Sequence, residues 1–201
     1  MSSTAPAPRV PLLSKEEARK RAAEVGLAEN FAELNVFRMM LQHPVLAGKV
    51  GSLLSMLLFE GNKFDPRQRE LIIMRLGWVS GSEYEWTAHW NLAIKMEMSE
   101  EEILAVQDWQ NSTILSDNDK TVLKATDEMV ERGAITATTW KQLETFIKTE
   151  EEKLELVIAI CNWRMFSQLL LSLEVPSEES MESWPPLGEL PSAALAARHR
   201  E

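Results

Sequence analysis

Cysteine is almost absent from this sequence. Cys161 is the only one among 201 residues, so an intrachain disulfide, a CxxC redox pair and a zinc–thiolate cluster are all excluded. Because Cys161 stands in an apolar stretch, we expect its thiol to be buried in the core. Stability must therefore come from packing, for which a hydrophobic content of 45% suffices.

Positive charge is also in short supply. Lys and Arg number 21 against 31 Asp and Glu, giving a net charge of −10, which argues against a broad nucleic-acid-binding surface. No uncharged apolar run approaches the ~20 residues that a membrane-spanning helix needs. Residues 1–10 contain no apolar signal-peptide core. We therefore expect a cytoplasmic protein with no nucleic-acid or membrane partner.

Proline is scarce except near the two ends of the chain. Seven of the nine prolines lie there, at positions 6, 8, 11, 176, 185, 186 and 191. Proline-rich stretches are typical of extended arms rather than of packed helices. We predict a flexible N-terminal arm at residues 1–11, a single all-α domain at 12–175 and a proline-rich C-terminal arm at 176–201.

Period-two alternation, which is typical of a half-buried strand, is missing, and helix signals are frequent instead. Ser14, Ser99 and Thr149 each stand three residues before a glutamate, which is the capping-box pattern. Asp65-Pro66 places an N-cap before a proline at the first helical position. We predict an all-α bundle with helices at about residues 14–26, 29–41, 45–60, 66–79, 83–96, 99–109, 118–132, 136–147 and 149–173.

A short internal repeat adds a second expectation about the bundle. Residues 70–73 read ELII and residues 155–158 read ELVI, and a tryptophan follows each at the same spacing. Short apolar matches also arise by chance. A genuine repeat would imply two similar helical halves packed face to face.

The most informative stretch runs over residues 69–90 and reads RELIIMRLGWVSGSEYEWTAHW. Glu85 and His89 are four residues apart on one predicted helix, so they share a face, and Ser82 precedes them near the helix start. A carboxylate beside an imidazole fixes its tautomer and raises its basicity, which suits general acid–base chemistry. Glu70 lies on the preceding apolar helix, and the tight Ser80-Gly81 turn could bring it towards His89.

Two other interpretations of this pair remain open on spacing alone. Glu and His at this spacing are often a simple surface contact. A Glu-x-x-x-His pair is also half of a metal site, but His43 and His199, the other histidines, are distant in sequence. Our prediction is that no metal binds.

The stretch from Arg69 to Ile103 resembles the core motif of the carboxymuconolactone decarboxylase / alkylhydroperoxidase D-like superfamily, and the resemblance extends over about residues 35–176. In the peroxidase branch, a glutamate is followed by a CxxC pair and a histidine. These positions correspond here to Glu70, to Ser82 and Glu85, and to His89, so both cysteines are missing. In the decarboxylase branch a glutamate stands four residues before the histidine, as Glu85 does before His89.

The resemblance implies an AhpD-like helical bundle, assembled as a homo-oligomer such as a trimer or hexamer. It also implies a cofactor-independent lyase of the decarboxylase type, acting by proton transfer on a small organic acid, lactone or keto acid. His89, Glu85 and Glu70 would be its catalytic residues. The alternatives are a non-catalytic ligand-binding oligomer of the same fold and a peroxidase-like enzyme, for which the thiol pair is missing.

Five residues near the predicted catalytic helix are candidates for binding the substrate. Trp86 and Trp90 flank the acid–base pair and could wall an apolar pocket, with methionines as adaptable lining. Arg75 is the nearest expected cation for a substrate carboxylate, unless an acidic residue pairs with it. Ser82 and Tyr84 complete the set. No glycine-rich phosphate loop or dinucleotide fingerprint occurs, so we expect no organic cofactor.

Overall fold

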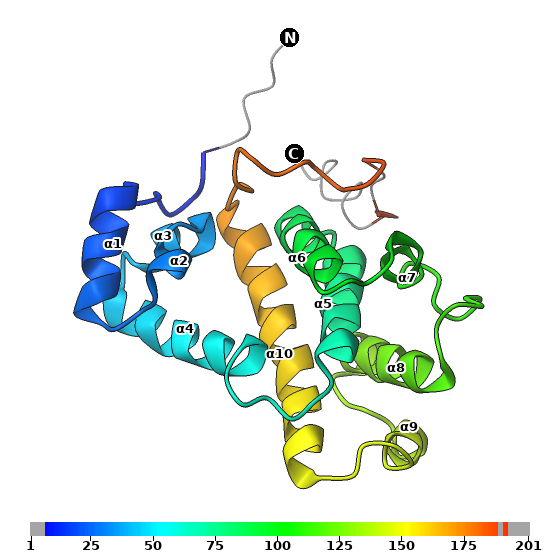
Figure 1. The fold of residues 1–201 in the computed structure, drawn as a ribbon. Helices are drawn as coiled ribbons and strands as arrows, with labels where there is room; N and C mark the ends of the chain where they lie inside the picture. The colour runs from blue at the N-terminus through cyan, green and yellow to red at the C-terminus, as the bar shows by residue number, and fades with distance from the viewer. Residues whose placement is uncertain (1–6, 189–190, 193–201) are drawn as a thin grey trace. The chain divides into compact units, whose positions relative to one another are not determined.

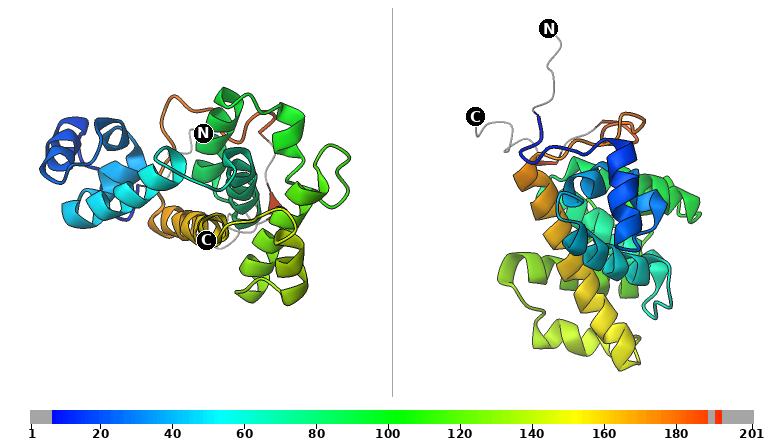
Figure 2. Two further views of the ribbon diagram at one scale, coloured as in Figure 1. Left: turned by 60° about the horizontal axis from the view of Figure 1, so that its bottom comes forward. Right: turned by 90° about the vertical axis from the view of Figure 1, so that its left-hand side faces the viewer.

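The computed structural model describes residues 7–188 and 191–192, and within them every regular element is a helix. The all-α prediction is therefore confirmed. Two compact units divide the chain, and Figures 1 and 2 show their helices as coiled ribbons joined by loops. The helices are α1 (Lys15–Glu24), α2 (Glu29–Ala32), α3 (Asn35–Met40), α4 (Pro44–Leu58), α5 (Pro66–Ser80), α6 (Glu83–Lys95), α7 (Glu100–Leu104), α8 (Asp117–Arg132), α9 (Ala137–Leu143) and α10 (Glu150–Leu173).

The helix starts agree with their sequence signals. The side chains of Ser14, Asp65 and Ser99 each accept a hydrogen bond from a backbone N–H of the first turn. Such caps satisfy donors that would otherwise be left unpaired at a helix start. Local chemistry therefore fixes where these helices begin.

Three predicted helices are shorter than expected. The helix expected at residues 29–41 is split into α2 and α3, because the chain leaves the helical conformation at Leu34, whose ψ is 135°. The helices expected at 99–109 and 136–147 end at Leu104 and Leu143. Turns follow both, and their backbone N–H groups bond to carbonyls nearby, including Gln107 to Leu104 and Phe146 to Leu143.

The first unit comprises residues 1–61 and 169–181 and contains α1 to α4. Both described arms of this unit are tied down. Arg9 donates to Leu173 through its backbone and pairs with Glu174 through its guanidinium. The Asn35 side chain donates to the carbonyls of Pro176 and Ser177. Much of both predicted arms, at residues 1–6, 189–190 and 193–201, lies outside the described residues, so their flexibility stays a prediction.

The second unit comprises residues 62–168 and 182–201 and contains α5 to α9 with most of α10. Helix α5 is buried on nearly all sides, as its apolar sequence predicts. It packs on α6 and α8, and Figure 1 shows α5 and α6 together with α10 beside them. The single domain expected at 12–175 stays a prediction. Both copies of the ELII-like repeat, at 70–73 and 155–158, lie in this one compact unit.

Helix α10 is long and apolar enough to cross a membrane by length and composition alone. The core helix of a globular unit passes the same test, and Leu156, Ile160 and Trp163 are buried inside this one. Its opposite face is exposed and includes Cys161. The prediction of a buried thiol is therefore wrong. An apolar helix has two faces, and its sequence did not show which one turns inward.

Candidate acid–base site

The crossing of α5 and α6 brings Glu70 and His89 together. Gly81 takes the left-handed conformation, with φ of 67°, and ends α5 so that the chain can reverse. Further back, a Cβ added at Gly77 would lie only 3.1 Å from the backbone nitrogen of Trp86, so the two helices approach as closely as glycine permits. Glu70 Oε2 then lies 2.8 Å from His89 Nδ1. The sequence prediction that this turn would join the two residues is confirmed in its geometry.

The other ring nitrogen of His89 has two neighbours. The indole N–H of Trp163, on α10, donates to His89 Nε2 over 3.1 Å, and the two rings are edge to face with centroids 5.8 Å apart. Glu85 Oε2 lies 3.6 Å from the same nitrogen, which is an ion-pair distance rather than a hydrogen bond. Since Nε2 accepts from Trp163, the neutral ring carries its proton on Nδ1 and donates it to Glu70.

The pKa values of Glu85 and His89 are both raised in this buried cluster. Glu70, Glu85 and His89 are 0%, 5% and 9% exposed. Burial raises the pKa of Glu85 to about 7, with nearby His89 opposing the shift and Glu70 adding to it. Burial also disfavours the charged form of His89, but the Glu70 carboxylate and then Glu85 outweigh it, so the pKa of His89 is raised. Near neutral pH, Glu85 can therefore both give and take a proton.

Arg69 is a fourth polar residue, beside Glu70, and no pattern in the sequence had marked it as part of the site. Its side chain is only 4% exposed, and its Nε lies 4.0 Å from Glu70 Oε1. Burial lowers the pKa of Arg69, against the opposing charges of Glu70, Glu155 and Asp65. Its Nε and Nη1 are buried and have no hydrogen-bond partner within the described part of the chain.

The two tryptophans predicted beside the acid–base pair lie elsewhere. Trp86 and Trp90 pack in an aromatic cluster with Trp78 and Trp184. The Trp86 indole donates to the Pro185 carbonyl over 2.8 Å. On a helix, each of these residues is one position past Glu85 or His89 and so turned about 100° away. The indole that touches His89 is Trp163, and no local pattern in the sequence connects these two residues.

Arg75 cannot serve as the substrate cation that we predicted. Its guanidinium forms a two-pronged pair with Asp127, at 2.7 and 2.8 Å, and donates to the carbonyls of Val106 and Gln107. The acidic partner left open at the sequence level is thus an aspartate of α8. Tyr84 is buried, and Ser82 is the buried N-cap residue of α6, with an Oγ that no described residue hydrogen-bonds.

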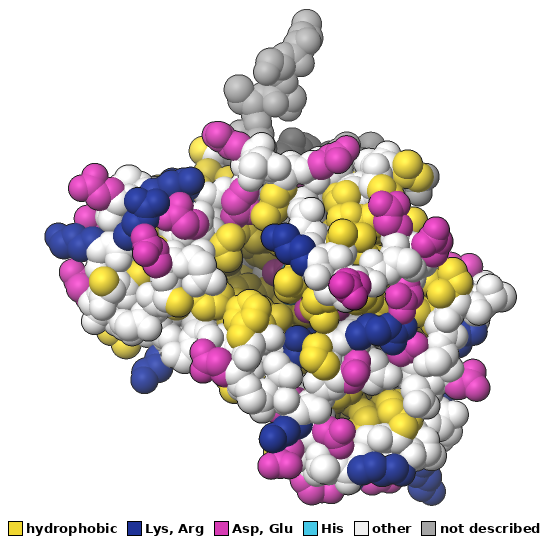
Figure 3. Space-filling view, viewed as in Figure 1, with side chains coloured by type: hydrophobic (Ala, Val, Ile, Leu, Met, Phe, Trp, Pro, Cys, Tyr) yellow, Lys and Arg dark blue, Asp and Glu magenta, His cyan; other side chains and the backbone are white. Residues whose placement is uncertain are grey.

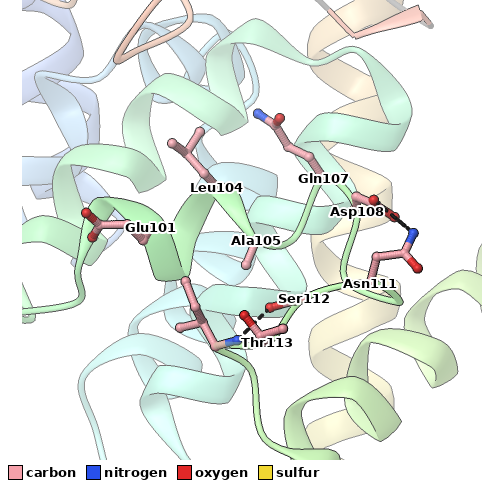
Figure 4. A pocket seen from close by; sticks show the side chains of 9 residues that line it. Glu101, Leu104, Ala105, Gln107, Asp108, Asn111, Ser112 and Thr113 are labelled. Carbon is pink, nitrogen blue, oxygen red and sulfur yellow. Dashed lines mark hydrogen bonds between the residues drawn. The ribbon is translucent and has the colours of Figure 1, made fainter.

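Neither of two surface hollows in the second unit includes the Glu70–Glu85–His89 trio. One is an open hollow of about 390 Å³ between α7 and the loop that follows. Figure 4 shows Asp108 and Asn111 pointing towards each other at its edge, where they hydrogen-bond. The other, of about 100 Å³, lies between Trp86, Leu104 and the residues around Trp184. Acidic side chains are scattered over the face that Figure 3 shows.

A search of residues 7–188 and 191–192 finds no group of three or more His, Cys, Asp or Glu side chains placed to hold a metal ion. Cys161 is two residues from Trp163 on α10, so its side chain is turned about 200° from the one that reaches His89. The described structure therefore places proton-transfer groups at this site without a thiol.

Comparison with known proteins agrees with this architecture. The model of the carboxymuconolactone decarboxylase family matches residues 51–128, and none of the curated protein sequences matches the chain. The AhpD core of an uncharacterized peroxidase-related protein from Ralstonia eutropha JMP134 has a TM-score of 0.71 at 14% identity, over 88% of this chain and 95% of that one. A cysteine-to-alanine variant of the debrominase Bmp8, in complex with 2,3,4-tribromopyrrole, has a TM-score of 0.72 at 14% identity, over 97% and 98%.

A third structure is that of a putative antioxidant defence protein AhpD from Agrobacterium tumefaciens. It has a TM-score of 0.59 at 18% identity, over 65% of this chain and 88% of that one. At such low identity these likenesses show the fold alone. The expected resemblance is confirmed: residues 51–128 match the model of the carboxymuconolactone decarboxylase family, and the chain has an AhpD-like fold.

Proposed function

We propose that this chain is a thiol-free enzyme that transfers protons on a small organic acid, with decarboxylation of a keto acid or lactone acid as its reaction. The observation that carries the proposal is the convergence of Glu70, Glu85 and His89 in one buried cluster. Two carboxylates around one imidazole can both orient it and hold a proton near neutral pH.

Each residue has a separate part in this reaction. The Glu70 carboxylate accepts a hydrogen bond from the Nδ1–H of His89 and so holds the ring in place. Glu85, with its pKa of about 7, stores the proton that the product needs. When the C–C bond to the leaving carboxylate breaks, CO2 departs and the electron pair stays on carbon as an enolate. The proton of Glu85 then passes to that carbon, directly or through His89 Nε2, and water restores it.

Peroxide reduction and debromination are the activities named for the similar solved structures. Redox chemistry by a cysteine pair has no support here, because Cys161 is the only cysteine and lies on the exposed face of α10. The remaining alternative is a non-catalytic ligand-binding protein of the same fold. It predicts that neutralising the carboxylates leaves function untouched.

Turnover separates these possibilities. We expect CO2 release from a panel of β-keto acids and lactone acids, and its loss by at least about 100-fold in His89→Gln and Glu85→Gln. Glu128→Gln is the matched control, since Glu128 is also a buried glutamate but binds only Thr136 and Thr139. Cys161→Ser should keep full activity. Equal turnover in the wild type and in both site variants would exclude the proposed mechanism.

A further inference from the structure

Three arginines lie on α5, and one of them lacks hydrogen-bond acceptors for two of its nitrogens among the described residues. Arg67 binds Glu102 and Asp119, and Arg75 binds Asp127 and two carbonyls. Arg69 is the most buried of the three by side-chain exposure, at 4% against 36% and 12%. Yet it is the one whose Nε and Nη1 meet no acceptor among the described residues.

Such an arrangement is unfavourable in the free protein. A buried polar group without a hydrogen-bond partner destabilises the folded state, and a charged one does so more strongly. The nearest carboxylate oxygen, Glu70 Oε1, is 4.0 Å from Nε, which is too far for a hydrogen bond. The other oxygen of Glu70 is taken by His89. Arg69 therefore has unmet capacity for an acceptor that the described residues do not provide.

The other acidic residues near Arg69 are also engaged. Glu155 Oε2 accepts the backbone N–H groups of Lys63 and Phe64 at 2.6 and 2.8 Å. Asp65 accepts the backbone N–H of Gln68 as the cap of α5. These helix-start and loop donors compensate the two negative charges. The Nε and Nη1 donors of Arg69 are thus left for another acceptor.

We propose that Arg69 is the residue that binds a carboxylate of the substrate. This inference rests on the proposed function and assigns its anion subsite. A guanidinium can hold a carboxylate along either of two edges, and each edge includes Nε or Nη1. Bound there, the acid would lie close to Glu70, whose Oε1 is 4.0 Å from Arg69 Nε.

Replacement of Arg69 should affect ligand affinity and the unfolding temperature in different directions. Replacing Arg69 by Met removes a buried charge whose Nε and Nη1 lack hydrogen-bond acceptors among the described residues, while keeping a similar length of apolar side chain. The Arg69→Met variant should therefore unfold at an equal or higher temperature than the wild type, yet lose the ligand. Arg75→Met is the matched control on the same helix. It breaks the paired contacts with Asp127, so it should lower the unfolding temperature and leave ligand affinity unchanged.

The experiment measures thermal unfolding and calorimetric binding with pyruvate, levulinate and succinate as probes. Methyl levulinate serves as the uncharged control and sodium chloride matches the ionic strength. We expect at least one of the three acids to stabilise the wild type, with a Kd that is about 10- to 100-fold weaker in Arg69→Met and partly restored in Arg69→Lys. Affinity should fall as the pH rises through 7, because a bound anion and ionised Glu85 repel each other. Arg75→Lys replaces the control if Arg75→Met does not fold.

Two results would overturn the inference. One is the absence of any acid-specific stabilisation of the wild type across the three probes. The other is wild-type affinity in Arg69→Met. The anion subsite and the acid–base mechanism can fail separately. Lost binding in Arg69→Met together with unaffected turnover in His89→Gln would contradict only the acid–base mechanism. Wild-type binding in Arg69→Met together with lost turnover in His89→Gln would contradict only the anion subsite.

Discussion

Replacing Glu85 by Gln should stabilise the folded chain at alkaline pH and leave it unchanged at acidic pH. Glu85 is 5% exposed and no hydrogen bond to its carboxylate is found among the described residues. A glutamine side chain has the same shape as that of Glu85 but cannot ionise. A carboxyl whose pKa is raised by folding contributes stability that is present below its unfolded pKa and lost as the pH rises through its folded pKa. The window for Glu85 thus runs from about pH 4.5 to about pH 7.

The size of the effect follows from the pKa of Glu85. The increase from 4.5 to about 7, at about 1.4 kcal/mol for each pKa unit, makes ionised Glu85 about 3 kcal/mol less favourable in the folded chain. The free energies of unfolding of wild type and Glu85→Gln should be nearly equal at about pH 4, below the unfolded pKa, and differ by up to about 3 kcal/mol at about pH 9. His89, whose pKa is also raised, adds a slope of the same sign to both proteins.

Urea unfolding followed by tryptophan fluorescence across this pH range measures the difference directly. Glu128→Gln supplies a control of opposite sign. Burial disfavours the Glu128 carboxylate, but hydrogen bonds from Thr136 and Thr139 outweigh it and lower its pKa, so its loss should destabilise at neutral pH and matter less in acid. A gap between wild type and Glu85→Gln that does not grow with pH would refute the assignment of a raised pKa to Glu85.

Three further results are expected. Trp163→Phe removes the donor that stabilises neutral His89, so the His89 titration followed by NMR should move to higher pH, and an unchanged midpoint would contradict the contact. Gly77→Ala places a Cβ 3.1 Å from the Trp86 backbone nitrogen, so the unfolding free energy should fall by about 1–3 kcal/mol. Wild-type stability would show that α5 and α6 can separate freely. Cys161 is exposed and should react with a thiol reagent in native protein, whereas a lack of reaction would mean that another copy covers this face of α10.

The sequence predicted the elements of the site that depend on nearby residues. Glu85 and His89 share a face because of their spacing, and Gly81 permits the turn that brings Glu70 to them. Helix starts were equally predictable, since each cap depends on a residue only three positions away. These features need no knowledge of how distant helices pack.

The contacts that the sequence missed all join distant parts of the chain. Trp163 is 74 positions from His89, and Trp86 was favoured only because it was adjacent. Arg75 and Arg69 differ in role because Asp127, 52 positions from Arg75, pairs with one of them and not the other. Cys161 was assigned to the core because α10 is apolar on both faces. Tertiary packing decides each of these cases, and local patterns in a single sequence do not reveal that packing.

The tautomer of His89 determines which residue gives up a proton first. With Nδ1–H donated to Glu70 and Nε2 occupied by the Trp163 indole, the neutral ring has no proton directed at a ligand. Glu85 is the group whose pKa of about 7 leaves it partly protonated at neutral pH. His89 can pass on that proton only if its Nε2 first loses the hydrogen bond from Trp163. In a Trp163→Phe variant that hydrogen bond is absent, so this step is not needed. Glu85, whose pKa is raised by burial, is therefore the immediate proton source, and water restores its proton.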